Sequence, residues 1–423
     1  MLEKPKLFLN LKEFWFLFIT LFFLLLVRLS FIYEAYDAFR ETPVYFTDVE
    51  VIQAYEKWND DEYHTILKVY SPSLDISFFS RTKIRSDDIS KKLRLKLFPS
   101  KTMSFFDYLG TGYISAQVKN IYPNKKSNKN ALFRLVEAQH SSDLMVDFYE
   151  AIFFAEPLEQ GLRREVSVLG ISHLIALSGF HLAILSAVLF FLIRLFYRPF
   201  QQRFFPYRFD LFDIGFLVLL LLAWYVWFVG SPPSLLRSYA MMLVAWILLV
   251  FGMELLSFFF LSTTVLVLLV LFPKLLLSLA FWFSVIGVFY IFLLLQYFSS
   301  LNKYLTTLLI SFGIFILMLP IVHLIFPITS KLQLLSPFLS LLFSFFYPLS
   351  MLLHFFHIGD ILDVGLLQLF SLKSEELLRL IPLNYGLFYL LLSFLAVYSK
   401  WIFYLLMVVA LSFSVWLFSG FWV

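Results

Sequence analysis

The sequence predicts a mainly α-helical protein that crosses a membrane about ten times and carries one small all-β domain outside the membrane. Hydrophobic residues make up 61% of the 423 residues, and the mean hydropathy is +0.83, which is more apolar surface than the core of a soluble domain absorbs. Charged residues make up only 15%, and 38 of the 62 charges lie between Glu34 and Glu165. From Pro43 to Pro123 the apolar residues recur with a period near two, the pattern of β-strands. The charged stretch therefore marks a polar domain within a polytopic membrane protein.

The composition excludes several kinds of chemistry. The chain has no cysteine, so it forms no disulfide, thiolate zinc site or iron–sulfur cluster and offers no cysteine nucleophile. The formal net charge of +4 is small for this length and does not indicate a protein that coats nucleic acid over its whole surface. The sequence contains no G-x-x-x-x-G-K-[ST] motif, so we expect the energy for any transport to come from a partner motor or an ion gradient.

Residues 1–33 are predicted to form an N-terminal membrane anchor. The stretch from Phe14 to Tyr33 is apolar except for Arg28 and is close to the roughly 20 residues that cross a bilayer. It has no small-residue cleavage site, so we expect an uncleaved anchor. Lysines precede it and none directly follows, which places the N-terminus in the cytoplasm because cytoplasmic loops carry an excess of positive charge. In the inner (cytoplasmic) membrane of a bacterium, the polar segment that follows is then periplasmic.

Residues 34–130 are predicted to form this periplasmic β domain. Apolar residues that alternate or cluster between turn-forming residues indicate roughly four or five short strands. The clearest candidates are residues 44–51, 65–70, 93–98 and 113–119. So many strands in so short a segment suit a small closed or nearly closed barrel of the OB type. Residues 131–167 return to helical spacing and are predicted to form a helical connector.

Beyond Val166 the chain is a series of apolar runs that predict the remaining spans. Prolines and charged residues separate the runs, each of which is about long enough to cross a bilayer. They are residues 168–193, 211–230, 235–252, 257–272, 275–297, 304–326, 334–356, 384–398 and 401–421. Residues 168–357 form a transmembrane core, and residues 383–423 form a C-terminal transmembrane hairpin. Residues 358–382 mix acids and bases with leucines, which predicts an interfacial amphipathic helix.

The most unusual apolar run contains two histidines, two serines and two glycines in Gly170-Ile-Ser-His-Leu-Ile-Ala-Leu-Ser-Gly-Phe-His181. Polar side chains in hydrocarbon cost free energy, so they normally face a bundle interior or an aqueous cavity. On an unbroken helix His173 and His181 point within about 80° of each other. A break at Ser178 and Gly179 would instead expose backbone groups, which are tolerated only beside a cavity. Close packing of neighbouring helices on the same serines and glycines is the alternative interpretation.

A second unusual passage begins a predicted span with two prolines and then places Arg237 in its first turns. Proline fits the start of a helix because the first amides lack partners within the helix. A side chain that snorkels to the outer interface is one interpretation of Arg237. The other is a fixed positive charge that attracts phosphate, because a guanidinium group suits that ligand better than an ammonium group does.

Both passages resemble a known family. HLIALSGFH, residues 173–181, is similar to the HLLAISGLH signature of the ComEC-type competence proteins, the inner-membrane channels that admit single-stranded DNA during natural transformation. Residues 233–241 resemble the P-S-x-x-R-A-x-x-M stretch of that family, with Ser238 in place of the usual alanine. Residues 105–109 and 278–284 are looser matches, and Trp282 replaces a family glutamine. The likeness extends in order over residues 14–356.

The chain departs from the family pattern at its C-terminal end. Family members often carry a metallo-β-lactamase-like domain that is held to degrade the non-transferred strand. This sequence ends in the apolar segment Trp401–Val423 and contains no H-x-H-x-D-H cluster. The resemblance is therefore to a short form that lacks this domain, and strand degradation is expected to belong to another protein or not to occur at this step.

The resemblance implies that the chain conducts single-stranded DNA into the cytoplasm and is not an enzyme. The implied channel-lining residues are His173, Ser178, Gly179 and His181. The residues implied to guide phosphates are Arg237, Ser234 and Ser238. No catalytic residue, metal or cofactor is expected. The implied partners are single-stranded DNA, the lipid bilayer, a periplasmic DNA-delivery protein, and a cytoplasmic motor or single-strand-binding protein, whereas assembly as a homo-oligomer stays open.

The charge of the β domain bears on the same function. Between Arg81 and Lys129 there are twelve Lys or Arg residues and three acids, a local net charge of +9 (12 minus 3). Single strands bind where a positive groove follows the backbone and aromatic rings stack on the bases. The expected DNA contacts are Lys91, Lys92, Arg94 and Lys96. The ordinary alternative is that lysines alternating with leucines form the solvated face of a strand.

Two other functions stay open. Leu177-Ser178-Gly179 resembles the Ser-Gly of rhomboid-type intramembrane serine proteases, although Ala176 stands where the first glycine of their G-x-S-G belongs. A serine nucleophile also needs a base within hydrogen-bond distance, and the candidates are His323, His354 and His357. A small-solute transporter would fit a broken polar helix among ten spans, but polar residues are few and scattered in the second half of the chain.

Overall fold

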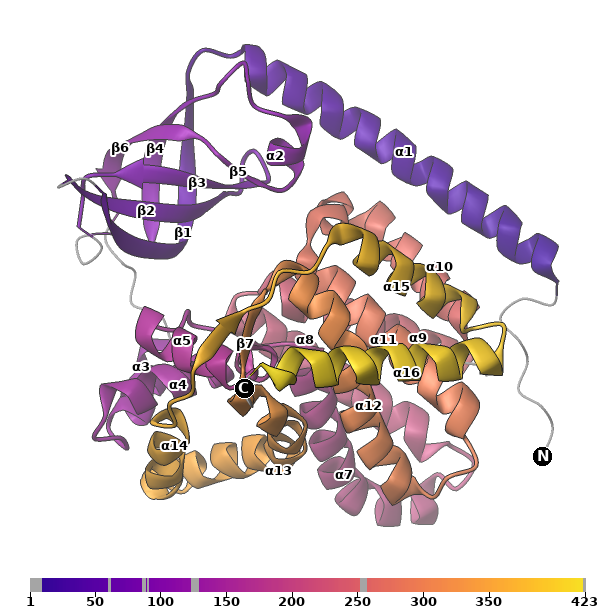
Figure 1. The fold of residues 1–423 in the computed structure, drawn as a ribbon. Helices are drawn as coiled ribbons and strands as arrows, with labels where there is room; N and C mark the ends of the chain where they lie inside the picture. The colour runs from indigo at the N-terminus through magenta and orange to yellow at the C-terminus, as the bar shows by residue number, and fades with distance from the viewer. Residues whose placement is uncertain are drawn as a thin grey trace. The chain divides into compact units, whose positions relative to one another are not determined.

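The computed structural model describes residues 10–59, 62–85, 89, 91–122, 129–251 and 257–420. The protein is mainly helical (68%) and has a small β region (Figure 1). The chain divides into two compact units. The β unit is built from Phe8–Asn130 and Ser262–Phe281, and the helical unit is built mainly from Ala131–Leu261 and Trp282–Val423.

The β unit begins with a long apolar helix, α1 (Leu11–Glu41). The helix continues past Tyr33, where the predicted anchor ends, because Tyr36 and Phe39 on its last turns are buried in the core of the β-sheet. The Tyr36 hydroxyl donates a hydrogen bond of 2.6 Å to the backbone carbonyl of Met103. Most of the earlier side chains are apolar and exposed, as is expected of a helix surrounded by lipid.

The strands of the β unit form one closed sheet. The sheet contains β1 (Tyr45–Asn59), β2 (Glu62–Ser71), β3 (Ile76–Thr82), β4 (Lys92–Phe98), β5 (Thr111–Tyr113) and β6 (Ser115–Ile121), in the order β5-β3-β2-β1-β4-β6. Only Ile114 separates β5 from β6. Because β5 pairs with β3 in parallel and β6 pairs with β4 antiparallel, this last segment joins the two edges of the sheet.

One strand of this sheet was absent from the sequence prediction. In β3 two adjacent phenylalanines hide the alternation of the sequence, although burial alternates along the strand and Phe78 is buried whereas Phe79 is only half-buried. The short helix α2 (Phe105–Leu109) lies between β4 and β5. It begins at Ser104, whose hydroxyl accepts a hydrogen bond from the Asp107 amide while the Asp107 carboxylate accepts one from the Ser104 amide. This reciprocal cap fixes the start of the helix.

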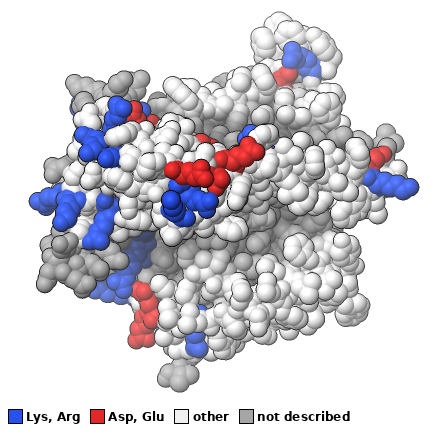
Figure 2. Space-filling model, turned by 90° about the horizontal axis from the view of Figure 1, so that it is seen from above, with Lys and Arg blue, Asp and Glu red and all other residues white. Residues whose placement is uncertain are grey.

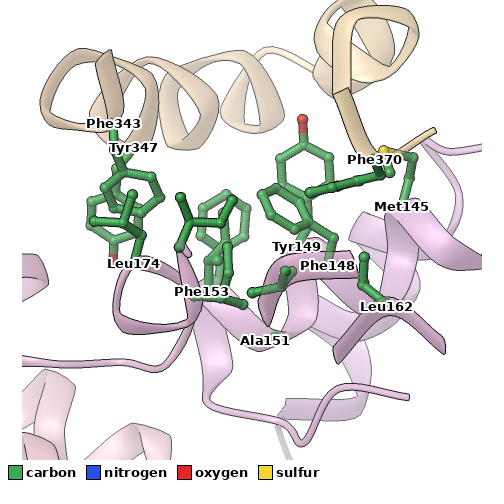
Figure 3. Packing of buried hydrophobic residues seen from close by; sticks show 14 of the residues in the cluster. Met145, Phe148, Tyr149, Ala151, Phe153, Leu162, Leu174, Phe343, Tyr347 and Phe370 are labelled. Carbon is green, nitrogen blue, oxygen red and sulfur yellow. The ribbon is translucent and has the colours of Figure 1, made fainter. Parts of the chain in front are cut away.

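Three short helices form the connector at the start of the helical unit: α3 (Lys129–Glu137), α4 (Asp143–Phe154) and α5 (Gln160–Val168). The buried face of α4 packs against α13 (Ser336–Phe355) and α14 (Asp363–Phe370) in one hydrophobic core. Figure 3 shows Phe148 and Tyr149 of α4 beside Phe370, and Leu174 beside Phe343 and Tyr347 of α13. The connector is therefore part of the same packed unit as the apolar helices of the second half of the chain.

The prediction of a single span at residues 168–193 was wrong, because the helical backbone stops after Ile175, resumes at Gly179 and continues to Phe204. The other predicted spans correspond to helices near the predicted places, and the helices formed by the apolar runs have the following bounds. They are α6 (Ser172–Ile175), α7 (Gly179–Phe204), α8 (Asp210–Val229), α9 (Pro233–Val250), α10 (Phe258–Leu271), α11 (Leu279–Phe298), α12 (Lys303–Ile325), α13, α15 (Leu383–Leu395) and α16 (Lys400–Ser419). In the described residues seven helices, α1, α7, α8, α11, α12, α13 and α16, are long and apolar enough to cross a membrane. Figure 2 shows a largely uncharged surface, with Lys and Arg gathered mainly toward one side of the view. The total of ten spans stays a prediction, because α9, α10 and α15 are shorter.

The segment 358–382 differs from the predicted amphipathic helix. It contains a 3₁₀ turn at Gly359–Leu362, the short helix α14, and β8 (Glu376–Leu378), which pairs antiparallel with β7 (Ile328–Ser330). The Arg164 guanidinium forms an ion pair of 2.9 Å with Glu376 of this strand. The prediction of one continuous helix was wrong, because α14 ends at Phe370 and the backbone beyond it makes its hydrogen bonds to a distant segment.

Candidate functional site

The candidate site is an interruption between the helices α6 and α7. The helical backbone stops after Ile175 and resumes at Gly179, so residues 176–178 lie between two helices rather than within one. The Ser178 hydroxyl accepts a hydrogen bond of 3.3 Å from the Phe180 amide. The His181 Nδ1 atom accepts one of 3.3 Å from the Ser178 amide. Ser178 and His181 therefore form a capping box that starts α7 at this place.

The second sequence motif packs directly on this interruption. The Ser234 hydroxyl, in the first turn of α9, donates a hydrogen bond of 2.7 Å to the backbone carbonyl of Leu177. A Cβ atom placed on Gly179 would lie 2.8 Å from the Ser238 Oγ atom and 3.2 Å from its Cβ. The Ser238 hydroxyl itself donates to the Ser234 carbonyl at 2.9 Å. The helix interruption and the start of α9 thus form one site, in which the absence of a side chain at Gly179 allows close approach.

The two histidines of the motif lie in different surroundings. His181 is fully buried, with its ring centroid 5.1 Å from that of Phe343 and 4.8 Å from that of Tyr347. Its Nε2 atom has no hydrogen-bond partner within the described part of the chain. His173 is exposed, and its Nε2 atom lies 3.3 Å from the Ser340 hydroxyl. The channel-lining role of both side chains stays a prediction, and in this conformation His181 packs against aromatic rings.

The residues predicted to guide phosphates come together at the start of α9. Arg237 is buried, with only 8% of its surface exposed. The hydroxyl protons of Ser234 and Ser238 are already donated to backbone carbonyls, so neither hydroxyl is a free donor for a phosphate oxygen. Among these three residues, the positive charge that could attract a phosphate belongs to the Arg237 guanidinium. Phosphate guidance stays a prediction for all three residues.

The residues predicted to bind DNA lie on the outer face of the β unit. Along β4 the leucines are buried, whereas Lys92 and Arg94 are exposed and Lys96 is half-buried. The Lys92 ammonium forms an ion pair of 3.0 Å with Glu50. Arg94 lies opposite Asp48 in the register of β1 and β4. Carboxylates from β1 therefore offset part of the positive charge of this face, while Lys91 adjoins it and the Lys96 ammonium lies 5.0 Å from the centre of the Phe98 ring.

A separate cavity lies toward the other end of α7. Its volume is about 420 Å³, and its lining includes Tyr197, Phe205, Arg208, Asp213 and Trp246. The Asp213 carboxylate forms an ion pair of 2.6 Å with Arg208 and accepts a hydrogen bond of 2.6 Å from the Tyr197 hydroxyl. Along a helix, Tyr197 lies roughly 28 Å from Ser178. This cavity is therefore distinct from the helix interruption.

One cluster of titratable groups has no signal in the sequence. The His140 side chain lies between Asp363 and His354, which are more than two hundred residues away along the chain. No periodicity or motif spacing connects residues so far apart. Within the described residues no group of three or more His, Asp or Glu side chains is arranged to hold a metal ion.

Comparison with known proteins supplies a family for most of the chain. The family model described as Competence protein matches residues 155–422, which are 268 of the 423 residues (422 minus 155, plus 1). The match includes the helix interruption and the start of α9. No curated protein and no solved structure matches the chain.

Proposed function

The chain belongs to the competence protein family, and we propose that it conducts incoming single-stranded DNA across the bacterial inner membrane during natural transformation. The family indicates a role in DNA uptake for transformation. The apolar helices α1, α7, α8, α11, α12, α13 and α16 indicate a multi-pass membrane protein. Beyond these two statements, we propose that the conducted molecule is single-stranded DNA, that the membrane is the inner membrane, and that this chain carries out no covalent chemistry.

The observation that carries the proposal is the helix interruption at residues 176–178. Backbone amides and carbonyls released from a helix are tolerated at membrane depth only where they are buried in protein or line an aqueous path. The Leu177 carbonyl is held by Ser234, whereas the neighbouring His173, Ala176 and Phe180 are exposed. These exposed positions are the side of the interruption that would face the strand. Weak polar groups at such a place replace part of the lost hydration and still let the strand move on.

The same geometry argues against the serine protease alternative. The His181 Nδ1 atom accepts the Ser178 amide proton at 3.3 Å and lies 3.4 Å from the Ser178 hydroxyl oxygen. A catalytic base must be free to take the hydroxyl proton and is normally oriented by a third group. Here the His181 Nδ1 atom serves the helix cap. Two of the bases predicted from the sequence have other partners, because His323 contacts the Leu319 carbonyl and His354 contacts the Ser350 carbonyl and His140. We therefore propose no catalytic residue, metal or cofactor for this chain.

The β unit takes the role of a periplasmic DNA-gathering domain in this proposal. Its cyclic strand order, closed by the β5–β6 segment, supports an OB-type barrel, a fold that binds oligonucleotides. The lysines before α1 support a cytoplasmic N-terminus. A periplasmic DNA-delivery protein and a cytoplasmic motor or single-strand-binding protein would act before and after the membrane step.

Deletion of the gene from a transformable strain tests the proposed function. Transformants are expected to disappear while labelled DNA still reaches the periplasm, because only the step across the inner membrane is removed. The measurement is the amount of labelled DNA on either side of that membrane, together with the transformation frequency. Labelled DNA in the cytoplasm of the deletion strain at the wild-type level would contradict the proposal.

Charge reversal on the β unit tests the DNA-gathering role. Replacing Lys91, Lys92 and Arg94 by glutamate should weaken the binding of fluorescent single-stranded DNA by the full-length protein and flatten its salt dependence, because fewer counterions are released. Replacing Asp48 by asparagine and Glu50 by glutamine should strengthen the binding and make its salt dependence steeper, since these carboxylates offset the charge of β4. Reversal of the exposed Lys303, Lys373 and Lys400 is the control with the same change in net charge. If the charge reversal on the β unit and the control reversal weaken DNA binding equally, the role assigned to β4 is wrong.

A further inference from the structure

A buried chain of hydrogen bonds joins the connector to α13 and α14. The His140 Nδ1 atom lies 2.7 Å from the Asp363 Oδ2 atom. On the other side of the ring, the His140 Nε2 atom lies 2.9 Å from the His354 Nε2 atom. The His354 Nδ1 atom lies 2.7 Å from the Ser350 backbone carbonyl. The His140 side chain is completely buried, and only 10% of the Asp363 side chain is exposed.

The Ser350 carbonyl, at the His354 end of the chain of hydrogen bonds, determines where the protons lie. A carbonyl only accepts, so the His354 Nδ1 atom carries a proton, and in neutral His354 the Nε2 atom is then an acceptor. The contact between the two Nε2 atoms therefore needs a proton on His140. One further proton lies between His140 Nδ1 and Asp363 Oδ2, whichever of the two atoms carries it. The three side chains together are neutral in this state, with one proton in each hydrogen bond.

His354 cannot take up an additional proton without breaking its contact with His140. The carbonyl acceptor keeps the proton on His354 Nδ1, so the lone pair of His354 Nε2 is the basic site inside the contact between the two rings. Protonation there would place two N–H groups against each other across 2.9 Å and add a positive charge beside His140. Burial makes this repulsion stronger than it would be in water. The contact between His140 and His354 is therefore stable only while the His354 Nε2 atom carries no proton.

The surroundings of the chain are neutral and closely packed. The Tyr149 ring stacks on His140, with centroids 4.6 Å apart, and meets the His354 ring edge to face at 4.5 Å. Burial and the charge of Asp363 raise the pKa of Tyr149, so its phenol stays neutral around physiological pH. In the described part of the chain, the titratable groups facing this site are Tyr149 from α4, His354 from α13 and Asp363 from α14.

Gln139 binds the same two segments without a titratable group. Its side-chain amide donates to the His354 carbonyl at 3.2 Å, and its oxygen accepts from the Gly359 amide at 2.9 Å. A Cβ atom at Gly359 would lie 2.8 Å from the His354 Nε2 atom and 2.9 Å from the Gln139 oxygen. The turn after α13 therefore packs directly against the histidine pair.

We propose that Asp363, His140 and His354 form a proton-binding site that holds the connector on α13 and α14 and opens when His354 takes up one more proton. The ligand is a proton from solvent, and the site acts on the helix whose Phe343 and Tyr347 rings cover His181. Acidification therefore loosens the end of α13 and the turn that follows it. The inference does not depend on which molecule the protein conducts.

Hydrogen exchange of the full-length protein tests the proposal. We expect the segments around Gln139–His140 and His354–Asp363 to lose protection as pH falls from about 8 to about 4, after correction for the intrinsic exchange rate. The range extends well below the ordinary histidine pKa of about 6.5 because burial disfavours a charged imidazole. The His354→Gln variant should keep its protection, because a glutamine oxygen accepts the His140 proton and does not titrate. Protection that is independent of pH in the wild type, or an unchanged pH profile in His354→Gln, overturns the proposal.

Two further measurements keep the test decisive. His357→Gln removes an exposed histidine next to the same turn and should retain the wild-type profile. The ¹⁵N chemical shifts of labelled histidine rings in the wild type report proton uptake directly. If the His354→Gln variant does not fold at about pH 8, this measurement serves as the test in its place. His354 is expected to gain its second proton in the pH interval in which protection falls. A loss of protection with no proton gained by His354 in that interval overturns the proposal.

Discussion

Replacing Gly179 by leucine is expected to reduce transformation at least about 100-fold, the equivalent of roughly 2.8 kcal/mol. A Cβ at this position would lie 3.2 Å from the Ser238 Cβ atom, so even alanine is tight and leucine cannot fit unless α9 moves. Overpacking of a tight helix contact costs about 1–3 kcal/mol. The displacement would also stretch the hydrogen bond from Ser234 to Leu177, which fixes the interruption. The measurement is the transformation frequency, with labelled DNA expected to remain in the periplasm.

Two comparisons separate this effect from general damage to the fold. Gly287→Leu places the same side chain in an apolar helix where a Cβ meets nothing within 4 Å, and it should transform like the wild type. Gly179→Ala should give an intermediate frequency that rises again when Ser238→Gly removes the opposing side chain. Normal transformation by Gly179→Leu, in protein present at the wild-type level, would remove the helix interruption from the proposed mechanism.

The helix interruption could be predicted from sequence because its cause is local. Serine and glycine are poor in helix interiors, and serine caps a helix three residues before a side chain that accepts its amide proton. The partner that braces the interruption was not predictable by this route. Ser234 lies 57 residues from Leu177, and only the packing of α7 against α9 brings them together. The two motifs were visible separately, and their contact belongs to the tertiary structure.

On the positive face of the β unit, the sequence predicted the direction of the side chains but overestimated the net charge. The alternation of basic residues and leucines in β4 correctly predicted which side chains point outward. The local charge of +9 counted only residues between Arg81 and Lys129, whereas Asp48 and Glu50 reach the same face from β1 through strand pairing. Net charge along a sequence therefore overstates the potential of a face when a neighbouring strand supplies acids. The His140 cluster escaped prediction for the same reason, because its members meet only through packing.

The His181→Leu variant is expected to reduce transformation to the level of the deletion strain. Leucine cannot accept the proton of the Ser178 amide, which His181 Nδ1 accepts in the capping box. Loss of a cap costs about 1 kcal/mol, and a buried amide without a partner costs about 1–3 kcal/mol. The start of α7 would then shift toward a different residue. The measurements are the transformation frequency and the thermal stability of the purified protein.

Glutamine at this position decides what the imidazole does. Gln is a favoured residue at this place of a capping box, so His181→Gln supplies an acceptor for the Ser178 amide without a ring. Because His181 is buried against Phe343 and Tyr347, we expect its main role to be the cap, and His181→Gln should transform within about tenfold of wild type, roughly 1.4 kcal/mol. If His181→Gln is as defective as His181→Leu while its stability is restored, the imidazole itself takes part in conduction. That outcome would require α13 to move away from His181 when the DNA strand passes. In the present packing the Phe343 and Tyr347 rings of α13 cover the buried imidazole.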